Sequence, residues 1–446
     1  MTKVITYGTF DLFHEGHYRL LQRAKELGDY LIVGVTTEGY DQNRGKLNVI
    51  DSLMTRVENV RKTGFADEIV IEESPGQKFR DIKKHHIDIF TVGSDWTGHF
   101  DYLNDYCKVV YLERTKDISS TMLRTQNKHI QRIGIIGTGR IAERFIPEVT
   151  LVSGISAQGV YNPNRESSIR FAENWNLNSY TVIEDFFAAV DAVYIASPHE
   201  THYGYIKMSL EHGKHVLCEK PMVLRKTEAE ELFQYAKDRN LVLFEGIKTA
   251  YSPGFSKLMG IACSGLIGNI RNVEACFTKL ENPENRELKD LKFGGSFTEL
   301  GSYSILPIIK IFGTEYEDIR FESIKDENGL DIFTKAYFKY GNGIGTATCG
   351  LGVKSEGHLI ISGTKGYIKV DPPWWKTTYF EVHYEDPNDI EKYSDRFLGD
   401  GLRYEINDFL SMINGVSETE FKLTPKDSIA IAGIMENFLW GRNKTN

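Results

Sequence analysis

Apolar runs of strand length alternate with amphipathic stretches of helical spacing along the first part of the chain. The segments that show this alternation, taken in order, are 3–7, 17–27, 30–35, 53–63, 69–71, 78–85 and 89–92. Four of them are short and apolar, as buried strands are, while 17–27, 53–63 and 78–85 are predicted to be helices. Strands that alternate with helices predict an α/β fold on a parallel sheet.

The same pattern begins again at residue 132. The strand-like run 132–136 leads into a glycine-rich turn and an amphipathic helix, and the polar stretch 125–129 before it is the expected linker. Beyond residue 250 longer β-rich stretches appear, followed by two helical ones, at 273–279, 334–340, 344–349, 358–362, 366–370, 403–414 and 425–440. This half predicts a mostly antiparallel sheet with helices on one face.

Composition narrows the class of protein. The 446 residues are 41% hydrophobic and 26% charged, as in ordinary globular chains. No apolar run reaches the roughly 18–20 residues of a membrane helix, and the five cysteines form no CxxC pair. The net charge of -9 argues against a general nucleic-acid binder. We expect a cytoplasmic protein whose partners are small molecules, with no nucleic acid and no membrane.

The stretch GTFDLFHEGH at 8–17 is the first candidate site. It places His14 and His17 where a strand ends and a helix begins. Two imidazoles at a helix N-terminus can bind the α-phosphate of a nucleoside triphosphate and stabilise charge as pyrophosphate leaves. Gly16 lets the backbone approach closely. The competing interpretation is a pair of surface histidines, and HxGH alone also permits an adenylyltransferase.

A second element, ISST at 118–121 after Arg114, favours nucleotide chemistry because hydroxyls at a helix start can hold phosphates. With GTFDLFHEGH, VGSDWTGHFDYL (92–103) and VVYLERT (109–115), residues 1–129 resemble the glycerol-3-phosphate cytidylyltransferase family. The resemblance implies CTP, accompanied by Mg²⁺, and a site that includes Lys46 against the pyrophosphate. The implied binding residues are Gly8, Thr9, Phe10, Asp11, His14, Gly16, His17, Asp95, Trp96, Arg114, Ser119 and Thr121. Gly64 replaces a second family arginine, so the acceptor is expected to differ from glycerol 3-phosphate.

The turn Gly137-Thr138-Gly139-Arg140-Ile141-Ala142 follows a strand and opens a helix, which is the dinucleotide-binding fingerprint. Asn162 ends the second strand, where NAD-binding proteins usually carry an Asp or Glu for the ribose 2′-hydroxyl. Because no carboxylate there would repel a 2′-phosphate, and because Arg165 follows closely, we predict NADP(H) in preference to NAD(H).

The run GKHVLCEKP at 213–221 follows SPHETH at 197–202 and precedes FGGSFTELGSY at 293–303. With these motifs, residues 130–446 resemble the Gfo/Idh/MocA oxidoreductases, especially their dihydrodiol dehydrogenase-like branch. The resemblance implies that Lys220 reaches between nicotinamide and substrate and that Glu299 and Tyr303 fill the positions of a family acid and aromatic residue. Further cofactor-binding positions are Ser197, Pro198, His199, His202 and Glu219.

Carbonyl reduction needs a proton donor and a cation near the developing alkoxide. We predict Tyr303 as the acid, with Lys220 lowering its pKa; the alternatives are a β-sheet aromatic and a surface lysine. Trp374 and Trp375 are expected to pack or to form an oligomer contact.

The predicted domains are a cytidylyltransferase at 1–129, a Rossmann domain at 130–250 and an α+β substrate and oligomerisation domain at 251–446. Together they predict a homo-oligomeric bifunctional enzyme that makes a CDP-polyol from CTP, NAD(P)H and a sugar or ketose phosphate, for capsule or cell-surface polymers. Two alternatives stay open. The two activities can serve separate substrates, or one domain can act only as a nucleotide sensor.

Overall fold

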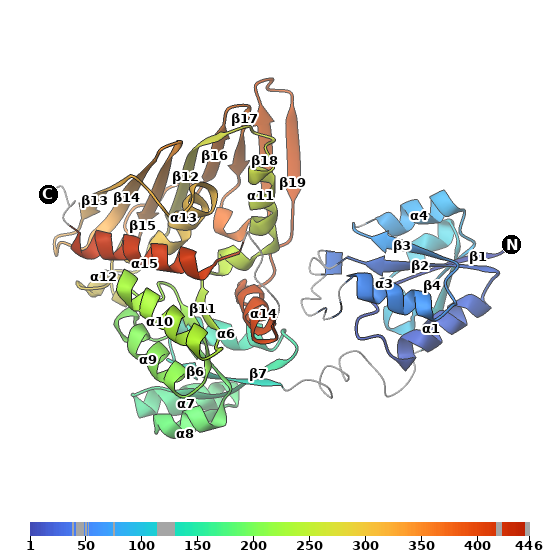
Figure 1. Ribbon diagram of the computed structural model, residues 1–446, viewed down its shortest axis with the longest axis horizontal. Helices are drawn as coiled ribbons and strands as arrows, with labels where there is room; N and C mark the ends of the chain where they lie inside the picture. The colour runs from blue at the N-terminus through green and yellow to red at the C-terminus, as the bar shows by residue number, and fades with distance from the viewer. Residues whose placement is uncertain are drawn as a thin grey trace. The chain divides into compact units, whose positions relative to one another are not determined.

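The structure is a computed structural model of the whole chain, and it describes residues 1–37, 40–41, 49, 51, 53–74, 76–113, 130–415 and 422–441, with the backbone alone at 54, 55 and 95. The chain divides into two compact units, 1–130 and 131–446 (Figure 1). Four predicted site residues lie outside the described residues, as does the linker 125–129: Lys46, Arg114, Ser119 and Thr121.

The first unit is built on a five-stranded parallel sheet. Its order is β3-β2-β1-β4-β5, with strands β1 (Lys3–Gly8), β2 (Tyr30–Thr36), β3 (Glu68–Glu72), β4 (Ile89–Gly93) and β5 (Lys108–Leu112). The helices are α1 (Glu15–Glu26), α3 (Leu53–Lys62) and α4 (Gln77–His85), and the short turns are η1 (Ser94–Trp96) and η2 (Asp101–Asp105). The strand order reverses between β1 and β4, so ligands are expected at the carboxyl end of β1, where GTFDLFHEGH begins.

The second unit opens with a six-stranded parallel sheet in the order β11-β10-β9-β6-β7-β8. Its strands are β6 (Gln131–Ile136), β7 (Ile155–Tyr161), β8 (Asn178–Tyr180), β9 (Ala192–Ile195), β10 (His215–Glu219) and β11 (Leu243–Gly246). The helices are α6 (Arg140–Val149), α7 (Arg165–Trp175), α8 (Ile183–Ala189), α9 (His199–Glu211) and α10 (Lys226–Asp238). Apolar side chains from β6, β9 and β10 pack against α8, α9 and α10 to form its core.

An eight-stranded sheet completes this unit, in the order β13-β14-β15-β12-β16-β17-β18-β19. Its strands are β12 (Ile270–Thr278), β13 (Asp318–Lys325), β14 (Asp331–Tyr340), β15 (Gly343–Gly350), β16 (Leu359–Gly363), β17 (Gly366–Val370), β18 (Tyr379–Tyr384) and β19 (Ile390–Ser394). Only the β12–β15 pair is parallel among the described strands of this sheet. The prediction of a mostly antiparallel sheet is therefore confirmed.

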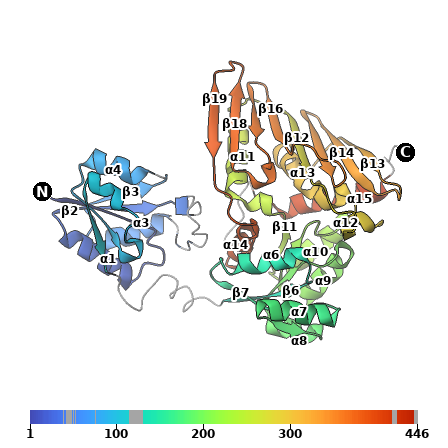
Figure 2. The same ribbon diagram turned by 180° about the vertical axis from the view of Figure 1, so that it is seen from behind.

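Helices lie along one face of this sheet. They include α11 (Pro253–Cys263), α13 (Ser296–Phe312) and α15 (Pro425–Trp440), as the two opposite views show (Figures 1 and 2). Elsewhere in the unit are η3 (Lys248–Tyr251), α12 (Arg286–Lys289), η4 (Trp374–Lys376) and α14 (Leu402–Ile413). Helix α13 packs against β12, β14 and β15, and almost every residue in it is buried.

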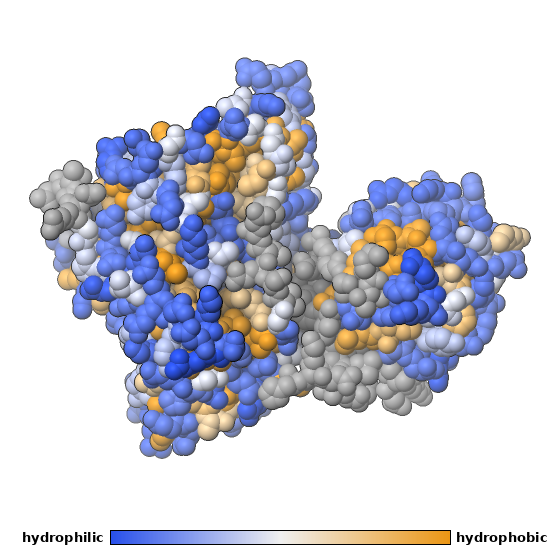
Figure 3. Space-filling model, in the orientation of Figure 1, coloured by the Kyte–Doolittle hydropathy of each residue, from blue (hydrophilic) through white to orange (hydrophobic). Residues whose placement is uncertain are grey.

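The surface seen in Figure 3 is mostly hydrophilic, with small apolar patches on each unit. Among the described residues, the longest apolar stretch of helix falls short of what a membrane crossing requires.

Candidate functional sites

The two histidines of GTFDLFHEGH meet at the start of α1. His14 caps the helix, and its Nδ1 accepts a hydrogen bond of 3.0 Å from the backbone N–H of Gly16. His17 lies one turn further, and its ring stacks on that of His14 with centroids 3.9 Å apart. Both imidazoles thus lie beside the N–H groups of a helix N-terminus at the switch point of the sheet, where an anionic phosphate is favoured.

The loop before α1 is held by contacts between the predicted residues Thr9 and Asp11 and two aspartates that the sequence did not point to. Asp11 and Asp51 bind each other's loops, since Asp51 N donates to Asp11 Oδ1 at 2.8 Å and Leu12 N donates to Asp51 Oδ2 at 2.9 Å. Thr9 donates to Asp41 Oδ1 at 2.9 Å. Neither Asp41 nor Asp51 has a local sequence signal, because each meets its partner about 30 to 40 residues away in the chain.

Arg56 is fully buried in the same loop scaffold. Its guanidinium donates to the carbonyl oxygens of Thr9 at 2.9 Å and Thr36 at 2.7 Å, and its Nε donates to Asp51 O at 2.9 Å. These contacts place Arg56 beneath GTFDLFHEGH, where it fixes the strand ends. Trp96, in contrast, is 42% exposed in η1.

The second unit contains a cavity of about 1000 Å³ between its Rossmann sheet and its large sheet. It is lined by residues that follow β6, β9 and β10, by the start of α13, and by residues of β12 and η4. Thirteen predicted residues line it: Gly137, Gly139, Arg140, Ile141, Asn162, Ser197, Pro198, His199, His202, Glu219, Lys220, Glu299 and Tyr303. Arg165 is exposed at the start of α7 and does not line this cavity.

The Rossmann end of this cavity has the form of a dinucleotide cradle. Gly137 has a φ of 106°, and a Cβ there would lie 2.6 Å from the carbonyl oxygen of Ala196, so only glycine fits. Gly139 caps α6 without a side-chain hydrogen bond, which leaves the first N–H groups of the helix for a diphosphate. Asn162 donates to Thr138 Oγ1 at 2.8 Å and accepts from Asn164 N, so an amide, not a carboxylate, lies at the ribose position.

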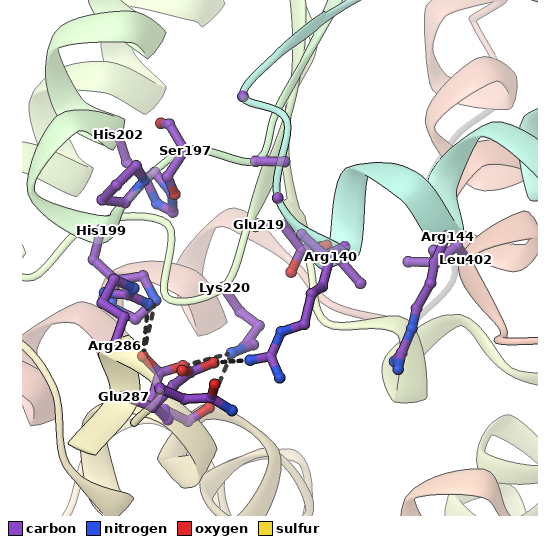
Figure 4. A pocket seen from close by; sticks show the side chains of 18 of the residues that line it. Arg140, Arg144, Ser197, His199, His202, Glu219, Lys220, Arg286, Glu287 and Leu402 are labelled. Carbon is purple, nitrogen blue, oxygen red and sulfur yellow. Dashed lines mark hydrogen bonds and ion pairs between the residues drawn. The ribbon is translucent and has the colours of Figure 1, made fainter. Parts of the chain in front are cut away.

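A cluster of charges lies at the other end of the dinucleotide cradle (Figure 4). Arg286 donates to Glu299 Oε1 at 2.9 Å, and the Lys220 ammonium donates to the backbone oxygen of Glu299 at 2.9 Å while lying 3.7 Å from its Oε2. His199 Nε2 lies 3.8 Å from Glu299 Oε1. Burial, together with the charges of His202, Lys220 and Arg286, lowers the pKa of His199 well below its ordinary value, so its imidazole is neutral at pH 7.

Tyr303 lies one helical turn after Glu299 on α13, so the β-sheet interpretation of this residue is wrong. The Lys220 ammonium is 5.9 Å from its ring centroid. Burial, and then the charges of Glu219 and Glu405, raise the pKa of the phenol well above its ordinary value. Burial is the largest of these causes, so the pKa of the phenol lies above its ordinary value although Lys220 lies nearby. The phenol keeps its proton at neutral pH, as a proton donor must.

His202 is a fully buried residue of the cavity wall. Its Nδ1 lies 3.0 Å from Pro221 O and its Nε2 lies 2.9 Å from Ser197 O. The ring therefore joins the loop after β9 to the loop after β10. Both ring nitrogens contact backbone oxygens, so His202 positions these two loops.

Several residues that line the cavity were missed by sequence reasoning. Trp375, expected to pack or to form an oligomer contact, stacks on Phe277 with ring centroids 3.6 Å apart and forms part of the wall. Lys248 and Arg286 line the cavity as well. Lys248 follows β11 by two residues, so its place at a strand's carboxyl end was the one available signal.

A metal site built from protein side chains is not evident in the part of the chain that the structure describes, where no three His, Cys, Asp or Glu side chains gather around a common point. A divalent cation that accompanies a nucleoside triphosphate is held largely by the phosphates.

The two sites define the class: an α/β nucleotidyltransferase unit joined to a dinucleotide-dependent oxidoreductase unit. Residues 5–126 match the cytidylyltransferase-like family, and residues 131–247 match the Gfo/Idh/MocA oxidoreductase family with its NAD-binding Rossmann fold. The chain belongs to the cytidylyltransferase-like family in its first unit and to the Gfo/Idh/MocA oxidoreductase family in its second, and it is a bifunctional enzyme.

Curated relatives support both assignments. Glycerol-3-phosphate cytidylyltransferase of Bacillus spizizenii is 48% identical over 124 residues, which cover 28% of this chain and 95% of the relative. Trans-1,2-dihydrobenzene-1,2-diol dehydrogenase of Bos taurus is 29% identical over 56% of this chain and 77% of its own length. The scyllo-inositol 2-dehydrogenase (NADP(+)) IolU of Bacillus subtilis is 27% identical over 68% of this chain and 95% of its own length.

Among solved structures, the UDP-N-acetylglucosamine 3-dehydrogenase GnnA from Acidithiobacillus ferrooxidans matches with a TM-score of 0.60 at 21% identity. The match covers 70% of this chain and 98% of that one, and it shows the shared fold.

Proposed function

We propose that the enzyme produces a CDP-polyol by transferring CMP from CTP to a sugar or polyol phosphate and by reducing a ketose carbonyl with NADPH. The observation that carries this proposal is the presence of both active sites on one chain, the first close in sequence to a cytidylyltransferase. Plausible acceptors are fructose 6-phosphate, ribulose 5-phosphate and dihydroxyacetone phosphate, which give CDP-sorbitol, CDP-ribitol and CDP-glycerol. Such products would supply capsule or other cell-surface polymers.

In the cytidylyl step, His14 and His17 bind the α-phosphate of CTP, beside the N-terminal N–H groups of α1. Their hydrogen bonds stabilise the charge that grows on that phosphate while the acceptor phosphate attacks in line and pyrophosphate departs. Arg56 supports this site indirectly, by fixing the carbonyls of Thr9 and Thr36.

In the reduction step, the bound dinucleotide supplies the hydride. The Lys220 ammonium orients the carbonyl and stabilises the oxygen as negative charge develops on it, and Tyr303 donates the proton. Arg286 and Lys220 hold Glu299 between them, so Glu299 keeps the lysine near the cavity's reacting end.

For the coenzyme we propose NADPH over NADH. Asn162 supports this preference because it leaves room for a 2′-phosphate without charge repulsion. Arg165 lies exposed at the start of α7, outside the cavity lining, so the preference is argued here from Asn162 and from the NADP named for the IolU relative.

The test is a panel of sugar and ketose phosphates incubated with CTP, Mg²⁺ and NADPH. Pyrophosphate release and NADPH absorbance are followed together, and the product is identified by mass spectrometry. A CDP-polyol formed from one ketose phosphate supports the proposal. If no ketose phosphate, before or after cytidylylation, supports NADPH oxidation, the coupled reaction is refuted. Light scattering of the same preparation tests the proposed homo-oligomer.

A second candidate is favoured by the 48% identity to glycerol-3-phosphate cytidylyltransferase. In it, the first unit transfers CMP to ready-made glycerol 3-phosphate while the reductase has a separate substrate. Rapid pyrophosphate release with glycerol 3-phosphate, without any ketose phosphate that serves both sites, would favour this candidate.

A further inference from the structure

The cavity of the second unit is lined by more positive than negative side chains. Among the described residues, seven lysines and arginines line it, against five carboxylates. His199 and His202 add no charge at pH 7, because burial lowers the pKa of both imidazoles. The lining therefore has an excess of two positive charges, which favours an anionic ligand.

Four of these cations form ion pairs with three of the carboxylates, as the pairs Arg140–Glu281, Arg140–Glu287, Lys279–Glu281, Lys220–Glu299 and Arg286–Glu299. The cations that remain are Arg144, Lys248 and Lys376, and no carboxylate in the described part of the chain forms an ion pair with any of them. The carboxylates that remain are Glu219, which accepts a hydrogen bond of 2.6 Å from a buried tyrosine, and Asp400. The excess of positive charge thus falls on cations that lack an ion-pair partner.

Two of these cations come from short turns that are bonded to each other. Lys248 belongs to η3 and Lys376 to η4. The hydroxyl of Thr249 donates to the backbone oxygen of Trp375 at 2.8 Å, so the chain neighbours of the two lysines are joined. Fully buried Trp374 ties η4 to β12 through a hydrogen bond of 2.9 Å from its Nε1 to a backbone oxygen. The two lysines are thus carried on a fixed frame, as the binding of a small anion requires.

A wall of aromatic rings connects this frame to the reacting groups. Trp375 stacks on Phe277 with ring centroids 3.6 Å apart, and Phe277 meets Tyr303 edge-on with centroids 5.3 Å apart. The Lys220 ammonium lies 5.9 Å from the centroid of the Tyr303 ring. All of these side chains line the cavity, so one continuous wall leads from the proton donor to Lys376.

This end of the cavity lies away from the cradle of the dinucleotide's diphosphate. The cradle follows β6, whereas Lys248 follows β11, and β9 and β10 lie between these two strands in the sheet. Three strand spacings of about 4.8 Å each put the two ends about 14 Å apart. Lys220 follows β10, between the cradle and Lys248. The two lysines therefore lie beyond the place expected for the nicotinamide, on the side that is left for the substrate.

The electrostatics of Lys248 also favour an anion beside it. Burial lowers the pKa of Lys248, and the charge of Lys376 adds to this effect. The carboxyl groups of Glu405, Glu219 and Asp400 oppose it. Burial, and then the charge of Glu219, raise the pKa of Glu405 well above its ordinary value, which favours its uncharged form. A phosphate group, with about 1.5 to 2 negative charges at pH 7, offsets both the burial and the mutual repulsion of the two lysines.

We propose that Lys248 and Lys376 bind the phosphate group of the ketose that the reductase reduces, and that they set its specificity for phosphorylated substrates. The inference rests on the proposed function, in which every acceptor is a phosphate ester. The ligand is a phosphate attached to the ketose, either as a terminal monoester or as the diphosphate of a CDP-ketose. Lysine ammonium groups hold such a phosphate as point charges. With the phosphate held at this end, the carbonyl group is directed towards Lys220 and Tyr303.

The first experiment measures anion binding in the full-length protein without turnover. Inorganic phosphate is titrated calorimetrically into the NADP⁺-saturated wild type and into the double variant Lys248→Met, Lys376→Met. Phosphate sites of the first unit contribute equally to both titrations, so the difference reports on the second unit. We expect the double variant to lose the heat of one bound phosphate. The control Lys257→Met, which removes an exposed lysine of the neighbouring α11 outside the cavity lining, keeps that heat. Equal heats in the wild type and the double variant overturn the proposal.

The second experiment separates phosphate recognition from a structural role. With the ketose phosphate that the substrate panel identifies, Lys248→Met and Lys376→Met should each raise KM about tenfold, as the loss of a hydrogen bond to a charged group does, and change kcat less than about threefold. For the same ketose without its phosphate, kcat/KM should stay within about twofold of the wild type. Lys248→Arg, which keeps the charge, should restore most of the affinity. An unchanged KM, or an equal loss for the unphosphorylated ketose, refutes the assignment.

His17→Ala distinguishes the two sources of the phosphate. In this variant without CTP no CDP-ketose forms, so reduction of the ketose phosphate identifies the monoester as the ligand. Reduction that begins only with a CDP-ketose made beforehand by the wild type identifies the diphosphate. In either case the two lysine variants must raise KM. If the wild type reduces neither form of any ketose in the panel, the proposed function fails, and the phosphate titration still decides this inference.

Discussion

Glu148 and Arg403 tie the helix that begins the dinucleotide cradle to the helix that carries Glu405. Arg403 Nε and Nη2 each donate to Glu148 at 2.8 Å, and the backbone N–H groups of Arg403 and Asp400 donate at 3.1 and 3.2 Å. The Arg403 side chain is only 16% exposed and the Glu148 side chain only 6%. We predict that breaking this pair destabilises the second unit strongly.

The magnitude follows from the geometry. Removing one partner of a buried ion pair costs about 3–5 kcal/mol, because the other charge stays buried. Glu148→Gln leaves Arg403, whose exposed 16% can still meet water, so we expect about 3 kcal/mol. Arg403→Met leaves the more deeply buried Glu148 with two backbone donors, so we expect about 3–4 kcal/mol. The double variant should cost less than the sum of the two, with a coupling of about 1.5–3 kcal/mol.

The assay is urea unfolding followed by tryptophan fluorescence. Four of the five tryptophans, at 175, 374, 375 and 440, belong to the second unit, so the signal reports mainly on it. Lys339→Gln, which breaks the exposed Lys339–Glu317 pair of the same unit, is the control and should change stability by less than about 1 kcal/mol. Additive costs in the double variant, or single costs below about 1 kcal/mol, would refute the reasoning.

The pair also has a pH signature. Burial acts to raise the pKa of Glu148, but the hydrogen bonds from Arg403 and from backbone N–H groups outweigh it, and the pKa lies below its ordinary value of 4.5. A lowered folded-state pKa stabilises the protein above the unfolded value. The difference between the wild type and Glu148→Gln should therefore be full near neutrality and shrink as pH falls below about 4.5.

Three further predictions concern the two active sites. Gly137→Ala should weaken NADPH binding at least tenfold, since its Cβ would lie 2.6 Å from a carbonyl oxygen; unchanged binding by fluorescence titration would contradict the cradle. His17→Ala should abolish pyrophosphate release from CTP but spare NADPH oxidation, and Lys220→Ala should do the reverse; equal loss of both activities in either variant would sink the separation. Asn162→Asp should raise the KM for NADPH about tenfold by repelling its 2′-phosphate and leave that for NADH nearly unchanged, as steady-state rates will show.

The sequence predicts much of the secondary structure because periodicity is a local property. The expected strand 30–35 is β2, Tyr30–Thr36, and the expected helix 425–440 is α15, Pro425–Trp440. The latter boundary is sharp because Thr424 and Asp427 form a capping box ahead of an apolar run. Helix α13 was missed for the opposite reason. It is buried nearly all round under the large sheet, so its apolar and polar residues are not sorted onto an inner and an outer face and its sequence carries no clear helical period.

That missed helix explains why the motifs could name Glu299 and Tyr303 but could not show how the two side chains share one cavity. On a strand, residues four apart share a face but lie far apart, whereas on a helix they lie one turn apart and point into one cavity. Burial raises the pKa of Tyr303 most, and the charges that add to it come from β10 and from α14, about 80 to 100 residues away in either direction. Glu219, Tyr303 and Glu405 come from three distant parts of the chain. No residue spacing within one motif could therefore connect them, and only the fold brings them together. The glutamate that no motif marks thus contributes to the charge around the phenol only because of the fold.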